Sequence, residues 1–132
     1  MKFLVFTFLF VIVTAEILYT KEQIETTNAI LNGCVEVTKI KPEKIEDMKN
    51  RIFDEDQTAK EYILCIYKKF RFIEEDGTIN KGNLRKFFGQ HALAGATLDK
   101  CIDEKGDSPA ATTYLIAKCY IQGLPPDVKG WL

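Results

Sequence analysis

The chain has 132 residues, of which 46% are hydrophobic, and its 18 basic and 19 acidic residues give a formal charge of −1. This near balance gives no electrostatic reason to expect a nucleic-acid or anionic-membrane partner. The length suits a single domain.

The first fifteen residues have the pattern of a secretory signal peptide. Lys2 precedes an apolar run over 3–13, and small residues before Glu16 offer a cleavage site. The alternative is a first core helix. The run is too short to cross a bilayer of about 30 Å, and no later segment is longer, so no stable membrane insertion is expected. We expect a signal peptide over 1–15 and one secreted domain over 16–132.

The first predicted helix runs from about Thr20 to Gly33, where glycine favours a stop. Ile24, Thr27 and Leu31 share one face of it. The next helix is predicted from about Pro42, because proline suits a first helical turn.

That second helix should extend to Ile52, with Ile45, Met48 and Ile52 as its inward stripe. The acidic residues 54–56 that follow can cap the exposed amides of the next helix. A solvated acidic turn is the simpler interpretation of the same residues.

The third predicted helix, about 56–70, contains a cysteine that does not fit the apolar stripe. The stripe consists of Ala59, Ile63, Ile66 and Phe70. Cys65 lies off the centre of this stripe, nearer Tyr62 and Lys69. A cysteine placed only for packing would sit among the isoleucines, so the position favours a disulfide to a neighbouring helix.

The segment 74–77, Glu-Glu-Asp-Gly, invites comparison with a calcium-binding loop. When Gly77 is aligned with the sixth loop position, Phe72 and Asn83 fall where an EF-hand requires acidic residues. The motif therefore fails, and the segment predicts a turn.

Three further helices are predicted after this turn. The first spans about 81–91 and ends with His91 on the same side as Phe87 and Phe88. The second spans about 96–105. Ser108 and Pro109 are a strong start signal for the last, which runs to about residue 121. The prediction is an all-α domain of about six short helices.

The four cysteines, Cys34, Cys65, Cys101 and Cys119, favour disulfides in a secreted protein, with three possible pairings. Their spacing and the single histidine do not suit a zinc or thiol redox site. No nucleophile motif accompanies His91, so neither an enzyme nor a cofactor is expected.

Two disulfides are more than a helical domain of this size usually requires. Each disulfide would stabilise the folded state by roughly 3–4 kcal/mol in the chain-entropy model. An internal cavity large enough for a ligand would destabilise the fold by a similar amount. A secreted chain exposed to proteases could carry disulfides for another reason. The aromatic content also suits an apolar interior, although an aromatic stripe is more often plain core.

The sequence resembles the insect odorant-binding proteins, the pheromone-binding and general odorant-binding family. The similarity rests on the signal peptide, the order of the helices, and the segments LCIYKKFRFIEEDG at 64–77 and SPAATTYLIAKCY at 108–120. It covers nearly the whole predicted mature chain.

Six-cysteine members of that family pair the first cysteine with the third, the second with the fifth and the fourth with the sixth. Here Glu61 and Ala110 stand where the second and fifth cysteines would be, so both partners of one bridge are absent together. The resemblance therefore points to the four-cysteine, minus-C branch. It implies the disulfides Cys34–Cys65 and Cys101–Cys119, and the lost bridge predicts a more adaptable cavity with broader ligand choice.

The resemblance implies a secreted carrier that binds and solubilises odorants, pheromones or similar semiochemicals. Tyr67 or Tyr114 is the candidate hydrogen-bonding group for the ligand. The wall candidates, chosen by amphipathic spacing, are Ile45, Met48, Ile52, Ile63, Ile66, Phe70, Phe87, Phe88, Tyr114, Leu115 and Trp131.

A membrane odorant receptor is a further candidate partner. The expected state is a monomer or weak homodimer, and sensillar lymph is a candidate location. The apolar tail over 127–132 could fold back as a lid. The alternative function uses the same scaffold in a salivary, venom, reproductive or defence protein that sequesters lipids or amines or binds a macromolecule.

Overall fold

The computed structural model describes residues 20–127, and within this range the chain folds into six α-helices. The predicted signal peptide, the tail from 128 onward and Trp131 lie outside the described residues. The helices are α2 (Lys21–Thr38), α3 (Pro42–Lys49), α4 (Gln57–Lys69), α5 (Lys81–Phe88), α6 (Ala92–Cys101) and α7 (Pro109–Gly123). The predicted all-α fold is confirmed.

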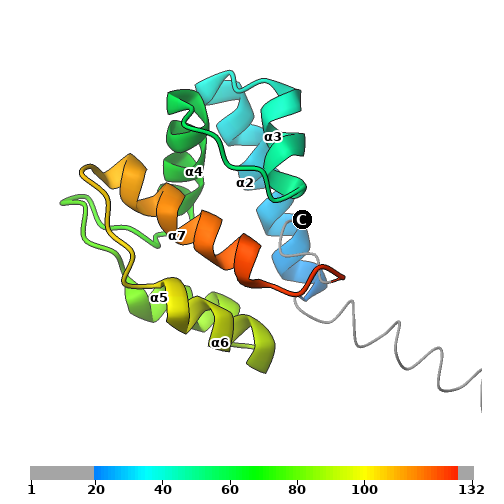
Figure 1. The fold of residues 1–132 in the computed structure, drawn as a ribbon, viewed down its shortest axis with the longest axis vertical. Helices are drawn as coiled ribbons and strands as arrows, with labels where there is room; N and C mark the ends of the chain where they lie inside the picture. Colours follow the sequence, from blue (N-terminus) through cyan, green and yellow to red (C-terminus); the bar gives the residue numbers. More distant parts are fainter. Residues whose placement is uncertain (1–19, 128–132) are drawn as a thin grey trace, which may run out of the picture.

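Helix α7 organises the others. It packs against α4 and α6, while α2 packs against α4 and α5 against α6. In the view of Figure 1, α7 crosses between the group formed by α2, α3 and α4 and the pair formed by α5 and α6. Because α7 touches both groups, most of its side chains are buried, including Ile116 at 0% exposure.

Two disulfides tie the helices together. Cys34 of α2 bonds to Cys65 of α4, with Cα atoms 5.8 Å apart, and Cys101 of α6 bonds to Cys119 of α7, with Cα atoms 5.5 Å apart. These are the pairings that the family resemblance implied. Each bridge joins two helices that already pack on one another.

Helix α2 is longer than its sequence predicted. Its start is confirmed, because Thr20 and Gln23 form a reciprocal capping box. The predicted stop at Gly33 is wrong, since the helix continues to Thr38 and ends at Lys39 in a left-handed conformation. A mid-helix glycine costs about 1 kcal/mol, and burial of the bridged Cys34 in the next position offsets this cost.

Two start signals predicted from sequence are confirmed. The side chain of Asp56 accepts a hydrogen bond from the backbone N–H of Ala59 at 3.0 Å and caps α4. Ser108 caps α7 in the same way, with Pro109 in the first helical turn.

The predicted turn after α4 is also confirmed. Gly77 adopts a positive φ of 91°, which glycine tolerates without strain. An isolated antiparallel bridge joins Ile73 and Ile79 on either side of it, and the N–H of Asn80 donates to the carbonyl of Phe72 at 2.8 Å. The turn thus holds Phe72 against the helices, at 4% exposure.

The boundary between α5 and α6 differs from the prediction. Helix α5 ends at Phe88, and α6 begins at Ala92, four residues earlier than expected. His91 does not continue α5. Its Nδ1 accepts a hydrogen bond from the N–H of Leu93 at 3.2 Å, so it is the N-cap of α6.

Candidate functional site

Six aromatic side chains from four parts of the chain meet beside α7. We call this set the aromatic cluster: Tyr67, Phe70, Phe72, Phe87, Phe88 and Tyr120. Tyr67 and Phe70 come from the end of α4, Phe72 from the following turn, Phe87 and Phe88 from α5, and Tyr120 from α7. The cluster therefore forms only when these segments pack together.

Phe72 is the centre of the aromatic cluster. Its ring stacks on Phe70, with centroids 5.0 Å apart and an interplanar angle of 5°. It meets Tyr67 at 5.5 Å and Phe87 at 5.6 Å, both edge to face. Such aromatic pairs contribute about 0.5–1.5 kcal/mol each beyond the area they bury. The contacts fix the rings relative to one another.

The outer rings of the aromatic cluster remain partly accessible. Phe70, Phe87 and Phe88 are half-buried, whereas Phe72 and Tyr120 are each only 4% exposed. The cluster thus has a buried base and an accessible apolar edge. An apolar molecule on that edge would gain roughly 25 cal/mol per Å² of surface removed from water.

Helix α2 is attached to both α5 and α4. The side-chain amide of Gln23 donates to the carbonyl of Phe87 at 3.2 Å. Further along α2, the Cys34–Cys65 disulfide fixes the helix to α4. These two attachments hold α2 to the end of α5 and to α4.

The residues predicted to line the ligand cavity differ in how deeply the structure buries them. Buried candidates are Met48, Ile63, Ile66, Tyr67 and Tyr114. Half-buried candidates packed against the core are Ile45, Phe70, Phe87 and Phe88. Leu115 is half-buried as well. Tyr67, Phe70, Phe87 and Phe88 belong to the aromatic cluster.

Ile52 was wrongly expected on the inward stripe of α3. Its side chain is 49% exposed. The helix ends at Lys49, and Arg51 turns the chain with a φ of 67°, so the helical spacing that predicted an inward Ile52 no longer applies.

Two members of the aromatic cluster were missed by the sequence analysis. Phe72 lies beyond the end of α4, where helical spacing makes no prediction. Tyr120 follows Ile116 by one turn of α7, and both are buried. A stripe through these two positions could have indicated Tyr120; no local signal indicates Phe72.

The two candidate tyrosines have different surroundings. The hydroxyl of Tyr114 donates to the backbone carbonyl of Asp54 at 2.6 Å, and its ring meets Phe53 edge to face at 5.5 Å. Burial, with the nearby Asp54 carboxylate second, raises the pKa of Tyr114 to about 12. Tyr114 is therefore engaged in holding the loop before α4.

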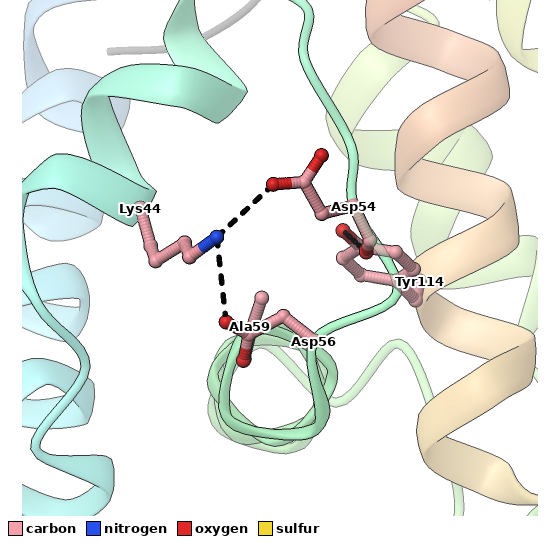
Figure 2. A network of polar contacts seen from close by, with 5 residues as sticks. All are labelled: Lys44, Asp54, Asp56, Ala59 and Tyr114. Atoms are coloured by element: carbon pink, nitrogen blue, oxygen red, sulfur yellow. Dashed lines mark hydrogen bonds and ion pairs between the residues drawn. The ribbon is translucent and has the colours of Figure 1, made fainter.

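That loop is further fixed by charged groups at the surface. Figure 2 shows Lys44 of α3 between the carboxylates of Asp54 and Asp56, at 3.0 and 3.7 Å, with Tyr114 beneath Asp54. The hydrogen bond to Asp54 and its charge raise the pKa of Lys44. The acidic residues here attach α3 to α4 and α7, which is a structural role.

The Tyr67 hydroxyl makes no hydrogen bond to another residue among 20–127, and the Tyr67 side chain is 7% exposed. Burial, followed by the nearby Tyr120, raises the pKa of Tyr67 well above its usual value. The phenol therefore stays neutral at physiological pH and retains a proton to donate. Of the two tyrosines, only Tyr67 keeps its donor available.

A described cleft outside the aromatic cluster has a different character. An open depression of about 530 Å³ lies between the turn over 76–79 and the connection from α6 to α7. Most residues lining it are charged or polar, and none is a wall candidate. This cleft does not fit an apolar ligand.

Over the described range, no three acidic, histidine or cysteine side chains are grouped so as to hold a metal ion. No helix between residues 20 and 127 has the length and apolar character needed to cross a membrane.

Comparisons with known proteins agree on one family. A family model described as PBP/GOBP family matches residues 18–123. The chain is 28% identical over 94 residues to odorant-binding protein 10 of Aedes aegypti, a match covering 67% of this chain and 66% of that relative, slightly less than two thirds of its length.

Solved structures share the arrangement of helices. Odorant binding protein 4 of the predator Chrysopa pallens superposes with a TM-score of 0.68 at 22% identity, over 80% of this chain and 98% of that one. The fatty acid binding protein OBP56a from the oral disk of the blowfly Phormia regina superposes with a TM-score of 0.59 at 21% identity. This match covers 79% of this chain and 93% of that one. At sequence identities of 21–22%, this similarity shows that the chain shares the fold of these proteins.

Proposed function

Since the chain belongs to the PBP/GOBP family, we propose that it is a carrier that binds and solubilises small hydrophobic molecules such as odorants, pheromones or similar semiochemicals. The observation that carries the proposal is the aromatic cluster. Its half-buried rings from α4 and α5 adjoin a buried base, in which the ring of Tyr67 contacts Phe72.

We place the internal cavity that the sequence predicted against this aromatic cluster. Ligand contact with Phe70, Phe87 and Phe88 would complete the burial of rings that the fold leaves partly accessible. Binding would draw mainly on apolar surface removed from water, so affinity should rise with ligand length until the cavity is full.

The proposal includes secretion after removal of residues 1–15, with 16–132 as the mature domain. The signal-peptide pattern and the two disulfides support this, because disulfides persist in oxidising compartments. Sensillar lymph as the location, a membrane odorant receptor as a partner and a monomer or weak homodimer as the working state are finer parts of the same proposal.

Displacement of a fluorescent apolar probe tests the carrier function. N-phenyl-1-naphthylamine should brighten and shift to the blue on binding, and ten-carbon volatiles should displace it. Phe87→Leu should weaken probe binding by about 3- to 10-fold, because a ring contact of the aromatic cluster is lost.

Phe53→Leu is the matched control. Phe53 is also half-buried, but its ring packs on Tyr114 and lies outside the aromatic cluster. Its substitution should leave probe affinity within about twofold of the native protein. Equal losses in both variants, or no displacement by any apolar compound, would refute the proposed site.

A further inference from the structure

Gly33 divides α2 into two parts that are attached to the protein in different ways. The second part, residues 34–38, begins with Cys34, which is 0% exposed and bonded to Cys65 of α4. The first part, residues 21–32, contains no cysteine. The disulfide therefore fixes the end of α2 to α4 and leaves the longer part of the helix to noncovalent contacts.

Residues 21–32 are only shallowly buried. Thr27 is the one fully buried residue among them, at 8% exposure, and its Oγ1 has no hydrogen-bond partner. Ile24, Ile30 and Leu31 are half-buried against the core. Opening of this part would expose little deeply buried apolar surface, and it would hydrate a hydroxyl that is unsatisfied in the closed state. Segments of this kind open locally at low free-energy cost.

A side-chain hydrogen bond joins the first part of α2 to the end of α5. The amide of Gln23 donates to the carbonyl of Phe87 at 3.2 Å, while its Oε1 accepts from the N–H of Thr20 at 2.9 Å and completes the capping box. The ring of Phe87 belongs to the aromatic cluster. A neutral hydrogen bond favours the closed state by a factor of about 3 to 10.

Gly33 lies at the junction of the two parts without a packing reason. Its backbone is helical, and outside the backbone of its own helix a Cβ at Gly33 would meet no atom within 4 Å. Gly106 is a contrast, because a Cβ there would lie 2.6 Å from the Cβ of Ala111. Glycine inside a helix favours non-helical conformations relative to alanine. Gly33 therefore gives α2 a weak point directly before the residue that the disulfide fixes.

We propose that residues 21–32, the hinged segment, swing on Gly33 and gate ligand exchange beside Phe87. In the closed state Gln23 bonds the carbonyl of Phe87. In the open state this hydrogen bond is broken and the hinged segment leaves the end of α5, while the disulfide keeps residues 34–38 on α4. The gating role rests on the proposed carrier function, whereas the hinge is a property of the fold alone.

Hydrogen exchange of the ligand-free protein, with both disulfides formed, tests the hinge. A helix of about twelve residues is marginal once it is detached, so amides over 25–36 exchange while the segment is open. Gly33→Ala should slow their exchange by about 3- to 5-fold, because alanine favours the straight helix. Gln23→Glu should speed it by about 3- to 10-fold, because glutamate keeps the capping box but its carboxylate has no N–H to donate to Phe87.

Gly82→Ala is the matched control. Gly82 is an exposed helical glycine of α5, where a Cβ would meet only the Asn80 side chain at 3.5 Å. This substitution should leave exchange over 25–36 within about twofold of the native protein. Circular dichroism verifies that each variant is folded. Unchanged exchange in Gly33→Ala, or the same change in Gly82→Ala, would overturn the hinge.

Stopped-flow release of N-phenyl-1-naphthylamine tests the gate. Release should be slowed about 3- to 5-fold by Gly33→Ala and accelerated about 3- to 10-fold by Gln23→Glu. The Kd should stay within about twofold in both variants, since association and dissociation pass the same gate. Unchanged release from Gly33→Ala, although its amides are better protected, would overturn the gating role. Failure of the probe to bind the native protein would instead overturn the carrier function, and hydrogen exchange would still decide the hinge.

Discussion

The guanidinium of Arg51 donates a 2.7 Å hydrogen bond to the backbone carbonyl of Pro125, 74 residues later in the chain. It also donates to the carbonyls of Ile121, at 2.8 Å, and Leu124. These acceptors lie at the end of α7, where helix carbonyls lack intrahelical partners and the helix dipole favours a cation. Arg51 therefore fastens the loop after α3 to the end of α7.

Arg51→Met should lower the free energy of unfolding by about 2–4 kcal/mol, because it leaves backbone carbonyls without a charged donor. Urea denaturation followed by circular dichroism measures the change. Arg85→Met is the control, since Arg85 forms an exposed pair with Asp99 at 3.4 Å, and it should cost less than about 1 kcal/mol. Similar losses in the two variants would contradict the role assigned to Arg51.

The two tyrosine variants should differ in stability. Tyr114→Phe removes the hydrogen bond to the Asp54 carbonyl and should cost about 1 kcal/mol. Tyr67→Phe removes no hydrogen bond within the described residues and should leave the free energy of unfolding unchanged or raise it. Thermal melting of the ligand-free proteins compares them. A larger loss for Tyr67→Phe than for Tyr114→Phe would show that Tyr67 has a structural partner.

Thr27→Val should stabilise the ligand-free protein by about 1 kcal/mol, because it removes a buried hydroxyl that has no partner. Thr113→Val is the matched substitution at a fully buried threonine whose hydroxyl donates to the carbonyl of Ala110 at 3.2 Å. That variant should be destabilised. Chemical denaturation of both proteins shows whether each substitution raises or lowers the free energy of unfolding. Destabilisation by Thr27→Val would argue against an unsatisfied hydroxyl at Thr27.

The two disulfides should differ modestly in their contributions to the free energy of unfolding. They close sequence separations of 31 residues for Cys34–Cys65 and 18 for Cys101–Cys119. The chain-entropy model then gives about 4 and about 3 kcal/mol, respectively. Replacing each pair by alanine and measuring urea unfolding tests this ranking. A small effect of removing Cys34–Cys65 would mean that α2 is held mainly by its packing on α4.

Alkaline pH should unfold the protein through its tyrosines. Burial raises the pKa of both Tyr62 and Tyr114 to about 12, against about 10 in the unfolded chain. Above pH 10 the unfolded state therefore binds fewer protons than the folded state, so stability falls as pH rises. The stabilisation that these two protonated tyrosines provide is complete below about pH 10 and is lost as the pH rises through about 12.

Tyrosinate absorbance and helix content, followed together in an alkaline titration, measure this effect. The absorbance of these buried tyrosines should rise together with the loss of helical circular dichroism. Full ionisation near pH 10 with the helices intact would contradict the burial of these phenols.

Local sequence signals determined most of the helical framework. Asp56 and Ser108 cap their helices as predicted, because a cap depends on residues within one turn. The pairing of Cys34 with Cys65 agrees with the family pattern that the sequence carries. Gly33 shows the limit of local signals, since burial of the neighbouring Cys34 outweighed the glycine stop.

Only the tertiary structure decided which side chains form the candidate site. Phe72 joins the aromatic cluster because a turn folds it back onto Phe70 and Phe87. Ile52 lies outside the interior because the helix has ended before it and Arg51 takes a positive φ. The sequence offered Tyr67 and Tyr114 as equal candidates. The backbone carbonyl of Asp54 accepts a hydrogen bond from Tyr114 and not from Tyr67. Local residue spacing cannot predict a contact between residues 60 positions apart.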